Sequence, residues 1–238
     1  MKVAVLSDTH GNLTAYEAVL ADVDTRGIRR IFHLGDVAGK GPRGSACCDL
    51  TRARCETTVL GNWEVFLLSE DATALSTSSR WWRDELSPGN REWLSNLPFS
   101  VDFELANTPI RCYHASADDV FHRIWPSVQG REWDELFQNT PSTGDAAPEP
   151  QVVIYGDIHH AWSRTMGNRT LINCGAVGNP MDKPTASYLV LDDDAGQLRW
   201  EIIRVPYDIE AELAVARELD MPGYRAWEHE LRTAEYAR

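Results

Sequence analysis

The feature that most constrains the fold is a short apolar run that ends in polar residues and recurs three times in the first third of the chain. The runs are KVAVLSD (residues 2–8), RRIFHLGD (residues 29–36) and TTVLGN (residues 57–62). Each reads as a buried strand whose carboxyl end carries a carboxylate or an amide, and helical segments separate them. This alternation predicts an α/β fold with parallel crossovers and with ligands bound outside the carboxyl ends of the strands.

A helix is expected after the first run. Apolar residues recur there at helical intervals, at Leu13, Tyr16, Leu20 and Val23. Thr14 and Glu17 have the spacing of a capping box, which predicts that the helix begins at Thr14, and Gly27 ends the run.

Residues 64–98 are expected to form a helical insert. Trp81, Trp82 and Trp93 occur there at loosely helical spacing, and the simplest interpretation is that their rings pack into the core. The second half reads mainly as strands. In order it contains a hairpin at 99–116, a loop at 140–150 that we expect to be mobile, a hairpin at 186–205 that turns at 194–196, and two amphipathic helices in about 208–238. With no internal repeat and no convincing boundary, residues 1–238 are predicted to form a single domain.

Composition and termini indicate an ordinary globular protein of the cytoplasm. The chain of 238 residues is 43% hydrophobic and 25% charged, which is typical of a globular domain with a substantial core. The apolar run at the N-terminus is too short for a signal peptide, and no run approaches a membrane span. Five cysteines, two of them adjacent, suggest no disulfide framework. We therefore expect cytoplasmic localisation and no membrane partner, and a homo-oligomer stays open.

The formal net charge of −13 argues against generic binding to nucleic acids or anionic membranes, because such binding requires a basic surface. It does not exclude a small anionic substrate that is drawn to a locally cationic site. A bound metal would provide such a site.

Each predicted strand end carries a side chain that can bind metal. These residues are Asp8, His10, Asp36, Asn62, His114, Asp157 and His159. Any one of them alone would be ordinary, and His33 is interpreted as a hydrogen-bonded core residue. Five loops with carboxylate, imidazole and amide at one edge are harder to explain as structure. Mixed oxygen and nitrogen ligands suit divalent metals such as manganese, iron or zinc.

The order of the motifs DTH, GDVAGKGP, GNWE, YHAS and GDIH resembles the calcineurin-like metallophosphoesterases, specifically their small bacterial and archaeal phosphodiesterase-like branch. The segment LINCGAVGNP is similar to the one that follows the last motif in that family. The resemblance spans about residues 1–207. It implies a β-sandwich of two mixed sheets flanked by helices, in four α-β-β-α layers, with two metals at the strand ends.

The resemblance also implies the roles of the ligands. One metal would bind Asp8, His10, Asp36 and His159. The second would bind Asp36, Asn62, His114 and Asp157, so that Asp36 bridges the pair and Asn62 also takes part in catalysis. We expect two divalent ions, manganese first, with iron, zinc, nickel or magnesium as alternatives. Such pairs lie ~3.5–4 Å apart and hold a hydroxide for in-line attack on phosphorus.

The implied activity is hydrolysis of phosphodiesters or activated phosphomonoesters, including nucleotide-derived ones. The alternative is a binding protein for a nucleotide or phosphate that keeps the scaffold but has weakened catalysis. Two departures from the family motifs keep both readings open.

The first departure is Asp157, where the family has the first histidine of G-H-x-H. An aspartate can itself bind an oxygen-preferring metal. Three carboxylates against two divalent ions leave a formal charge of +1, whereas two would leave +2, so phosphate would be attracted less strongly. The competing interpretation is that Asp157 only caps a turn and the second site is weak.

The second departure is Trp63, where the family has the histidine of G-N-H-D/E that contacts the phosphate and helps to protonate the leaving group. An indole cannot donate such a proton, but it can stack on a nucleobase or aryl group. The candidate substitutes as proton donors are His160 and His122. His122 and Arg123 could also contact the phosphate, and each of the three could instead be a surface residue. The Gly39-Lys40-Gly41 loop lacks the spacing of a phosphate-binding P-loop and is interpreted as a backbone turn near the metals.

Overall fold

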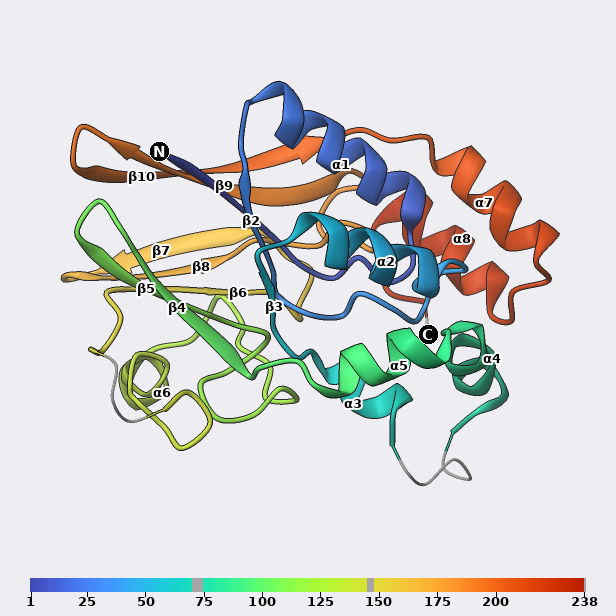
Figure 1. Ribbon diagram of the computed structural model, residues 1–238, viewed down its shortest axis with the longest axis horizontal. Coiled ribbons are helices and arrows are strands. Elements are labelled where there is room, and N and C mark those ends of the chain that lie inside the picture. The colour runs from blue at the N-terminus through green and yellow to red at the C-terminus, as the bar shows by residue number, and fades with distance from the viewer. Residues whose placement is uncertain (70–74, 145–147, 238) are drawn as a thin grey trace.

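Two mixed five-stranded sheets lie face to face in the computed structural model, which describes residues 1–69, 75–144 and 148–237 (Figure 1). The first sheet has the order β10 (Gln197–Val205), β9 (Ala186–Asp194), β1 (Lys2–Leu6), β2 (Arg30–His33) and β3 (Thr57–Thr58). The second has the order β4 (Ser100–Leu105), β5 (Thr108–Tyr113), β6 (Val152–Tyr155), β8 (Arg169–Asn173) and β7 (Trp162–Met166).

Helices cover both outer faces of this sandwich (Figure 1). The helices of the described residues are α1 (Leu13–Thr25), α2 (Gly44–Arg54), α3 (Asn62–Leu67), α4 (Thr77–Glu85), α5 (Pro88–Ser95), α6 (Gly130–Glu135), α7 (Ile209–Glu218) and α8 (Tyr224–Thr233). No helix in these ranges is both long and apolar enough to cross a membrane.

The predicted parallel crossovers are present. β1 pairs parallel with β2, and β2 with β3, while β9 and β10 add antiparallel strands at the other edge. In the second sheet β6 pairs parallel with both β5 and β8. The carboxyl ends of β1, β2, β3, β5 and β6 therefore point the same way within each sheet, which is the arrangement that gathers loop residues at one edge.

Alternation along β1 shows how the layers are built. Val3 and Val5 pack into the apolar core between the two sheets, whereas Ala4 and Leu6 face the core under α1 and α2. A third apolar cluster packs the region of α6 onto the outer face of the second sheet. These layers confirm the predicted α-β-β-α sandwich.

The start of α1 differs from the prediction. The cap is Asn12, whose side chain accepts a hydrogen bond from the Ala15 N–H at 3.0 Å. Thr14 lies inside the helix, and its hydroxyl donates to Glu212 of α7 at 2.7 Å. The capping box at Thr14 and Glu17 is therefore wrong, because a contact between distant helices uses the threonine hydroxyl.

Helices α3, α4 and α5 lie in the region of the helical insert expected at 64–98, although α3 begins two residues earlier and residues 70–74 lie outside the described residues. Trp82 is buried, and Trp81 and Trp93 pack against the same core beneath these helices, as predicted. The 186–205 hairpin and the two C-terminal helices also occur as expected. The loop at 140–150 contains residues 145–147, which lie outside the described residues, and the single-domain interpretation stays a prediction.

Candidate metal centre

The loops after five strands bring the seven candidate ligands to one edge of the sandwich. Asp8 and His10 follow β1, Asp36 follows β2, Asn62 opens α3 after β3, His114 follows β5, and Asp157 and His159 follow β6. All seven are buried.

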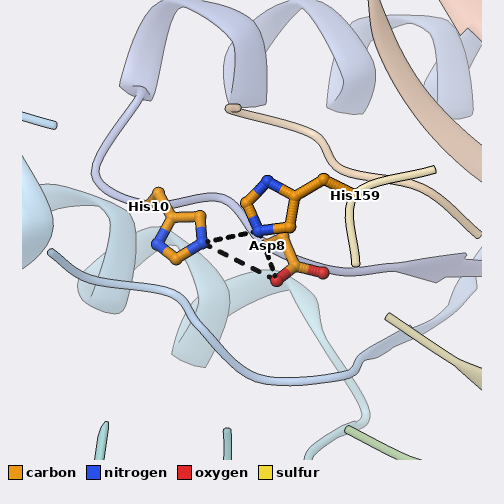
Figure 2. Close-up of side chains that lie close together, drawn as sticks. All are labelled: Asp8, His10 and His159. Atoms are coloured by element: carbon orange, nitrogen blue, oxygen red, sulfur yellow. Dashed lines mark hydrogen bonds and ion pairs between the residues drawn. The ribbon is translucent and has the colours of Figure 1, made fainter. Parts of the chain in front are cut away.

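Asp8, His10 and His159 form one tight group (Figure 2). The Nε2 atom of His159 lies 3.2 Å from Oδ1 of Asp8, and Nε2 of His10 lies 3.7 Å from the same oxygen. The two imidazole Nε2 atoms are 3.1 Å apart. Three potential ligand atoms thus face a common point, as the sticks in Figure 2 show.

Asp36 lies between this group and a second one that contains His114. Its Oδ2 is 3.5 Å from Nε2 of His10, and its Oδ1 is 3.5 Å from Nε2 of His114. Because its two oxygens face different imidazoles, Asp36 has the geometry of a bridging carboxylate. Asp8, Asp36 and His114 also form a group of ligand atoms within 4.8 Å of one another.

Asn62 and Asp157 lie next to His114. Asn62 donates a hydrogen bond from Nδ2 to Oδ1 of Asp157 at 2.7 Å, and that oxygen is 3.9 Å from Nε2 of His114. This part of the site has the donors of a second metal position, but its carboxylate is held by an amide.

Several atoms of the site have the unmet bonding capacity that a metal would satisfy. Among the described residues, Asp8 Oδ1, His114 Nε2 and Asp157 Oδ2 are buried without a hydrogen-bond partner. Buried polar atoms without partners cost free energy, so they require an explanation. The Nδ1 atom of His114 lies 2.7 Å from the Leu34 carbonyl oxygen, to which it donates, so Nε2 is left as a ligand atom. The residues present fit divalent metal ions.

The electrostatics of the site also favour cations. Burial alone would lower the pKa of His114, but the carboxylates of Asp36, Asp8 and Asp157 raise it to about 9. Burial and then the charges of Glu64 and Asp8 raise the pKa of Asp36 well above its usual range. The crowded carboxylates therefore attract positive charge, which divalent ions would supply.

Backbone strain is concentrated in these loops. The non-glycine residues with φ near +50° to +60° include Asp8, His10, Asp36, Lys40, Asp157 and His159. This left-handed region is costly for such residues and is typical of functional sites that the surrounding fold holds in place. A Cβ atom at the Gly61 position would collide with Asp36 Oδ1, which explains why glycine precedes Asn62 in the motif.

The sequence analysis missed two residues that shape the site. Glu64 is buried and accepts hydrogen bonds from the backbone N–H groups of Asp36 at 2.7 Å, Val37 at 2.9 Å and Gly61 at 3.0 Å. It therefore fixes the loop that carries Asp36. Its only signal in the sequence is its place as the last residue of GNWE.

Lys40 is the second missed residue. Its Nζ atom lies 3.4 Å from Nε2 of His159 and donates a hydrogen bond of 3.2 Å to Oδ1 of Asn179. The strained loop that was interpreted only as a turn thus places an ammonium group beside the candidate ligands.

Trp63 lies against the site through its backbone and its ring. Its N–H donates to Asp36 Oδ1 at 2.8 Å, and its indole makes an edge contact with the His10 ring at 5.5 Å between centroids. The Lys40 ammonium lies 5.6 Å from the centre of the indole ring. The indole occupies space beside the site but offers no group that could protonate a leaving group.

Arg123, His160 and His122, the other candidate site residues, do not all lie at the same cavity. Arg123 lies 3.6 Å from Asp157 Oδ2 through its Nε, and His160 lines the same cavity beside Asp157. His122 instead points to Glu132, at 3.3 Å, and borders a different cavity. His122 and Arg123 thus border different cavities, and their role as phosphate contacts stays a prediction.

Comparisons with known proteins agree with this geometry. The sequence model of the calcineurin-like phosphoesterase superfamily domain matches residues 1–196. An uncharacterized protein of Methanocaldococcus jannaschii is 28% identical over 228 residues, which cover 87% of this chain and 88% of the relative. A metallophosphoesterase structure from Sphaerobacter thermophilus has a TM-score of 0.74 at 26% identity and covers 98% of this chain and 100% of that one. A hypothetical protein from Pyrococcus horikoshii has a TM-score of 0.79 at 16% identity, with 99% of both chains covered. The chain therefore belongs to the calcineurin-like phosphoesterase superfamily.

Proposed function

We propose that this protein is a hydrolase that cleaves phosphodiesters or activated phosphomonoesters with the help of two divalent metal ions. The observation that carries the proposal is the position of Asp36, whose two oxygens each lie 3.5 Å from a different imidazole. The first ion would bind Asp8, His10, Asp36 and His159, and the second Asp36, Asn62, His114 and Asp157. Bound there, the ions would supply a hydroxide nucleophile and neutralise charge on the phosphate.

The chain's own residues would hold and orient the phosphate. Asp8, Asp36 and Asp157 against two divalent ions leave a formal charge of +1, and the Lys40 ammonium beside His159 raises it to +2. Lys40 therefore offsets the charge that Asp157 adds relative to the family motif. Arg123, whose Nε lies 3.6 Å from Asp157 Oδ2, would add a second cation near the expected phosphate position.

Oxygen donors dominate the second position, which supports manganese as the preferred ion, with iron, zinc, nickel and magnesium as alternatives. The substrate would be a small phosphate ester, including nucleotide-derived ones, met in the cytoplasm. A binding protein with weakened catalysis is the second candidate. Trp63 favours it, because the family motif has a proton-donating histidine at this position.

The test combines metal analysis with an activity screen. Purified protein is stripped with a chelator, reloaded with manganese, and assayed with bis(4-nitrophenyl) phosphate and 4-nitrophenyl phosphate. Two ions per chain and metal-dependent hydrolysis of at least one ester are expected. Two ions and tight phosphate binding without turnover would support the binding protein instead, and absence of metal binding would contradict both candidates.

A further inference from the structure

A cavity of about 570 Å³ opens directly beside the candidate metal centre. Asp157 and His159, two of the candidate ligands, form part of its wall, and the two cations Lys40 and Arg123 also line it. A phosphate group alone is far smaller than this space, which falls in the range of pockets that hold a drug-sized ligand. The cavity therefore has room for the rest of a substrate.

Two exposed aromatic side chains border that remaining volume. Trp125 is 49% exposed and Tyr236 is 71% exposed, and they come from chain segments more than one hundred residues apart. The ring of His160 meets the Trp125 ring edge-on at 6.0 Å between centroids, which helps to fix the indole. Single exposed aromatic residues need no explanation, but two at one cavity next to a candidate reaction centre indicate ligand contact.

The segment that carries Tyr236 is attached to the site. Buried Glu230 of α8 accepts hydrogen bonds from the Ala237 N–H at 3.2 Å and from Asn179 Nδ2 at 3.3 Å. Asn179 in turn accepts a hydrogen bond from Lys40. The residues after α8 are thus held at the cavity by the same network that holds Lys40. They lie beyond residues 1–196, the part of the chain that the family model matches.

Trp63 is a poor alternative platform for such a ligand. Its indole makes edge contacts with His10, Phe66 and Trp82, and it is not among the described residues that line the cavity. Trp125 and Tyr236, which do line the cavity, are better placed than Trp63 to stack on an aromatic ligand.

We propose that the cavity selects phosphate esters whose leaving group carries a planar aromatic ring, a nucleobase or an aryl group, which packs against Trp125 and Tyr236 while Lys40 and Arg123 face the phosphate. This inference rests on the proposed function for the position of the phosphate. Aromatic side chains recognise any such ring by its face, so they set the class of substrate rather than one compound.

The experiment measures binding rather than turnover. Manganese-loaded protein is titrated in a calorimeter with adenosine 5′-monophosphate, with ribose 5-phosphate, which lacks the base, and with phenyl phosphate. Wild-type protein should bind the nucleotide about tenfold more tightly than ribose 5-phosphate, since one stacked base contributes ~1.4 kcal/mol or more. Trp125→Ala and Tyr236→Ala should each remove most of this advantage and leave ribose 5-phosphate binding unchanged, whereas Tyr236→Phe should keep it.

Trp200→Ala is the matched control, because this tryptophan is also exposed but lies on β10. If the two variants also bind phenyl phosphate more weakly, the ring of the ligand lies next to the phosphate. If they bind only the nucleotide more weakly, the ring lies further from the phosphate. Both outcomes support the inference. Equal affinity for nucleotide and ribose 5-phosphate, or no effect of either variant, would overturn it. If the protein hydrolyses phosphate esters but does not bind aromatic ones more tightly, only this inference is wrong. If it binds aromatic esters more tightly but does not hydrolyse them, only the proposed hydrolase activity is wrong.

Discussion

Asn62 and Asp157 are joined by a hydrogen bond of 2.7 Å from the amide Nδ2 to the carboxylate Oδ1. The two residues come from different sheets, since Asn62 follows β3 and Asp157 follows β6. Rotation of the amide by half a turn would present its oxygen instead of its nitrogen to the same space. The pair can therefore hold itself together or, with the amide turned, present two oxygens to a cation.

Asp157→Ala should leave one metal ion per chain and reduce phosphoesterase activity by at least about tenfold, because the loss of metal-supporting groups costs about 10–100-fold even when they are not direct ligands. Elemental analysis after dialysis gives the stoichiometry. Asp134→Ala, at an exposed residue of α6, is the control and should keep both ions. Unchanged stoichiometry and rate in Asp157→Ala would mean that Asp157 is only a turn residue.

Lys40→Met should weaken competitive inhibition by inorganic phosphate by about ten- to a hundredfold, the effect of losing a hydrogen bond to a charged group. Lys40→Arg retains the charge and should recover part of the affinity. Lys183→Met removes an exposed lysine and should have no effect. If phosphate inhibits Lys40→Met as strongly as the wild type, the ammonium has no part in binding phosphate.

Trp63 leads to a prediction about leaving groups. No proton donor stands at this position, so the departing oxygen leaves as an anion and the rate should fall steeply as the pKa of the leaving group rises. Trp63→His should flatten this dependence, with the largest gain on alkyl esters. Rates are compared across a series of aryl and alkyl phosphodiesters with chemistry rate-limiting.

The rival account assigns the proton to His160, which lines the cavity, or to His122, which points to Glu132. This account would be supported if the rate depends steeply on the pKa of the leaving group only in His160→Gln or His122→Gln. Wild-type rates that are insensitive to leaving-group pKa would refute the argument from Trp63.

His33 should make stability depend on pH. It is buried, accepts the Gly35 N–H at Nδ1 at 3.2 Å, and donates from Nε2 to Thr9 Oγ1 at 2.8 Å, so it is the neutral core residue that was predicted. Burial lowers the pKa of His33 to about 3. The unfolded chain, with an ordinary pKa near 6.5, then binds the proton more readily, and stability falls as the pH drops below that value.

At pH 5.5 this effect amounts to ~1.4 kcal/mol. Urea unfolding of the metal-free protein at pH 7.5 and 5.5 measures it. His33→Gln should lose about that much less stability between the two pH values than the wild type does. The same pH dependence in both proteins would show that His33 does not carry the effect.

The sequence predicted the parts of this structure that depend on local pattern. The apolar runs before Asp8, Asp36 and Asn62 are strands because their side chains alternate between two cores, and parallel pairing brings their ends together. This pattern alone therefore predicts that the candidate ligands gather at one edge of the sandwich.

What the sequence did not predict depends on contacts between distant segments. The cap at Asn12 could be separated from Thr14 only by knowing that Glu212 binds the threonine hydroxyl. Lys40 is held by Asn179, and the segment that carries Tyr236 is held by the hydrogen bond from the Ala237 N–H to Glu230. No rule of sequence spacing connects these partners. Residues that line a cavity from several segments have no local signal.

The most direct test of the two-metal centre is the metal content of Asp36→Ala compared with that of the wild type. Both proteins are dialysed against manganese and then against metal-free buffer, and the ions per chain are counted by elemental analysis, with circular dichroism as a check that the variant is folded. The position of Asp36 between His10 and His114 predicts two ions in the wild type and none in the variant, because both proposed sites would lose a ligand and the shared charge. Two ions in folded Asp36→Ala would contradict the assignment.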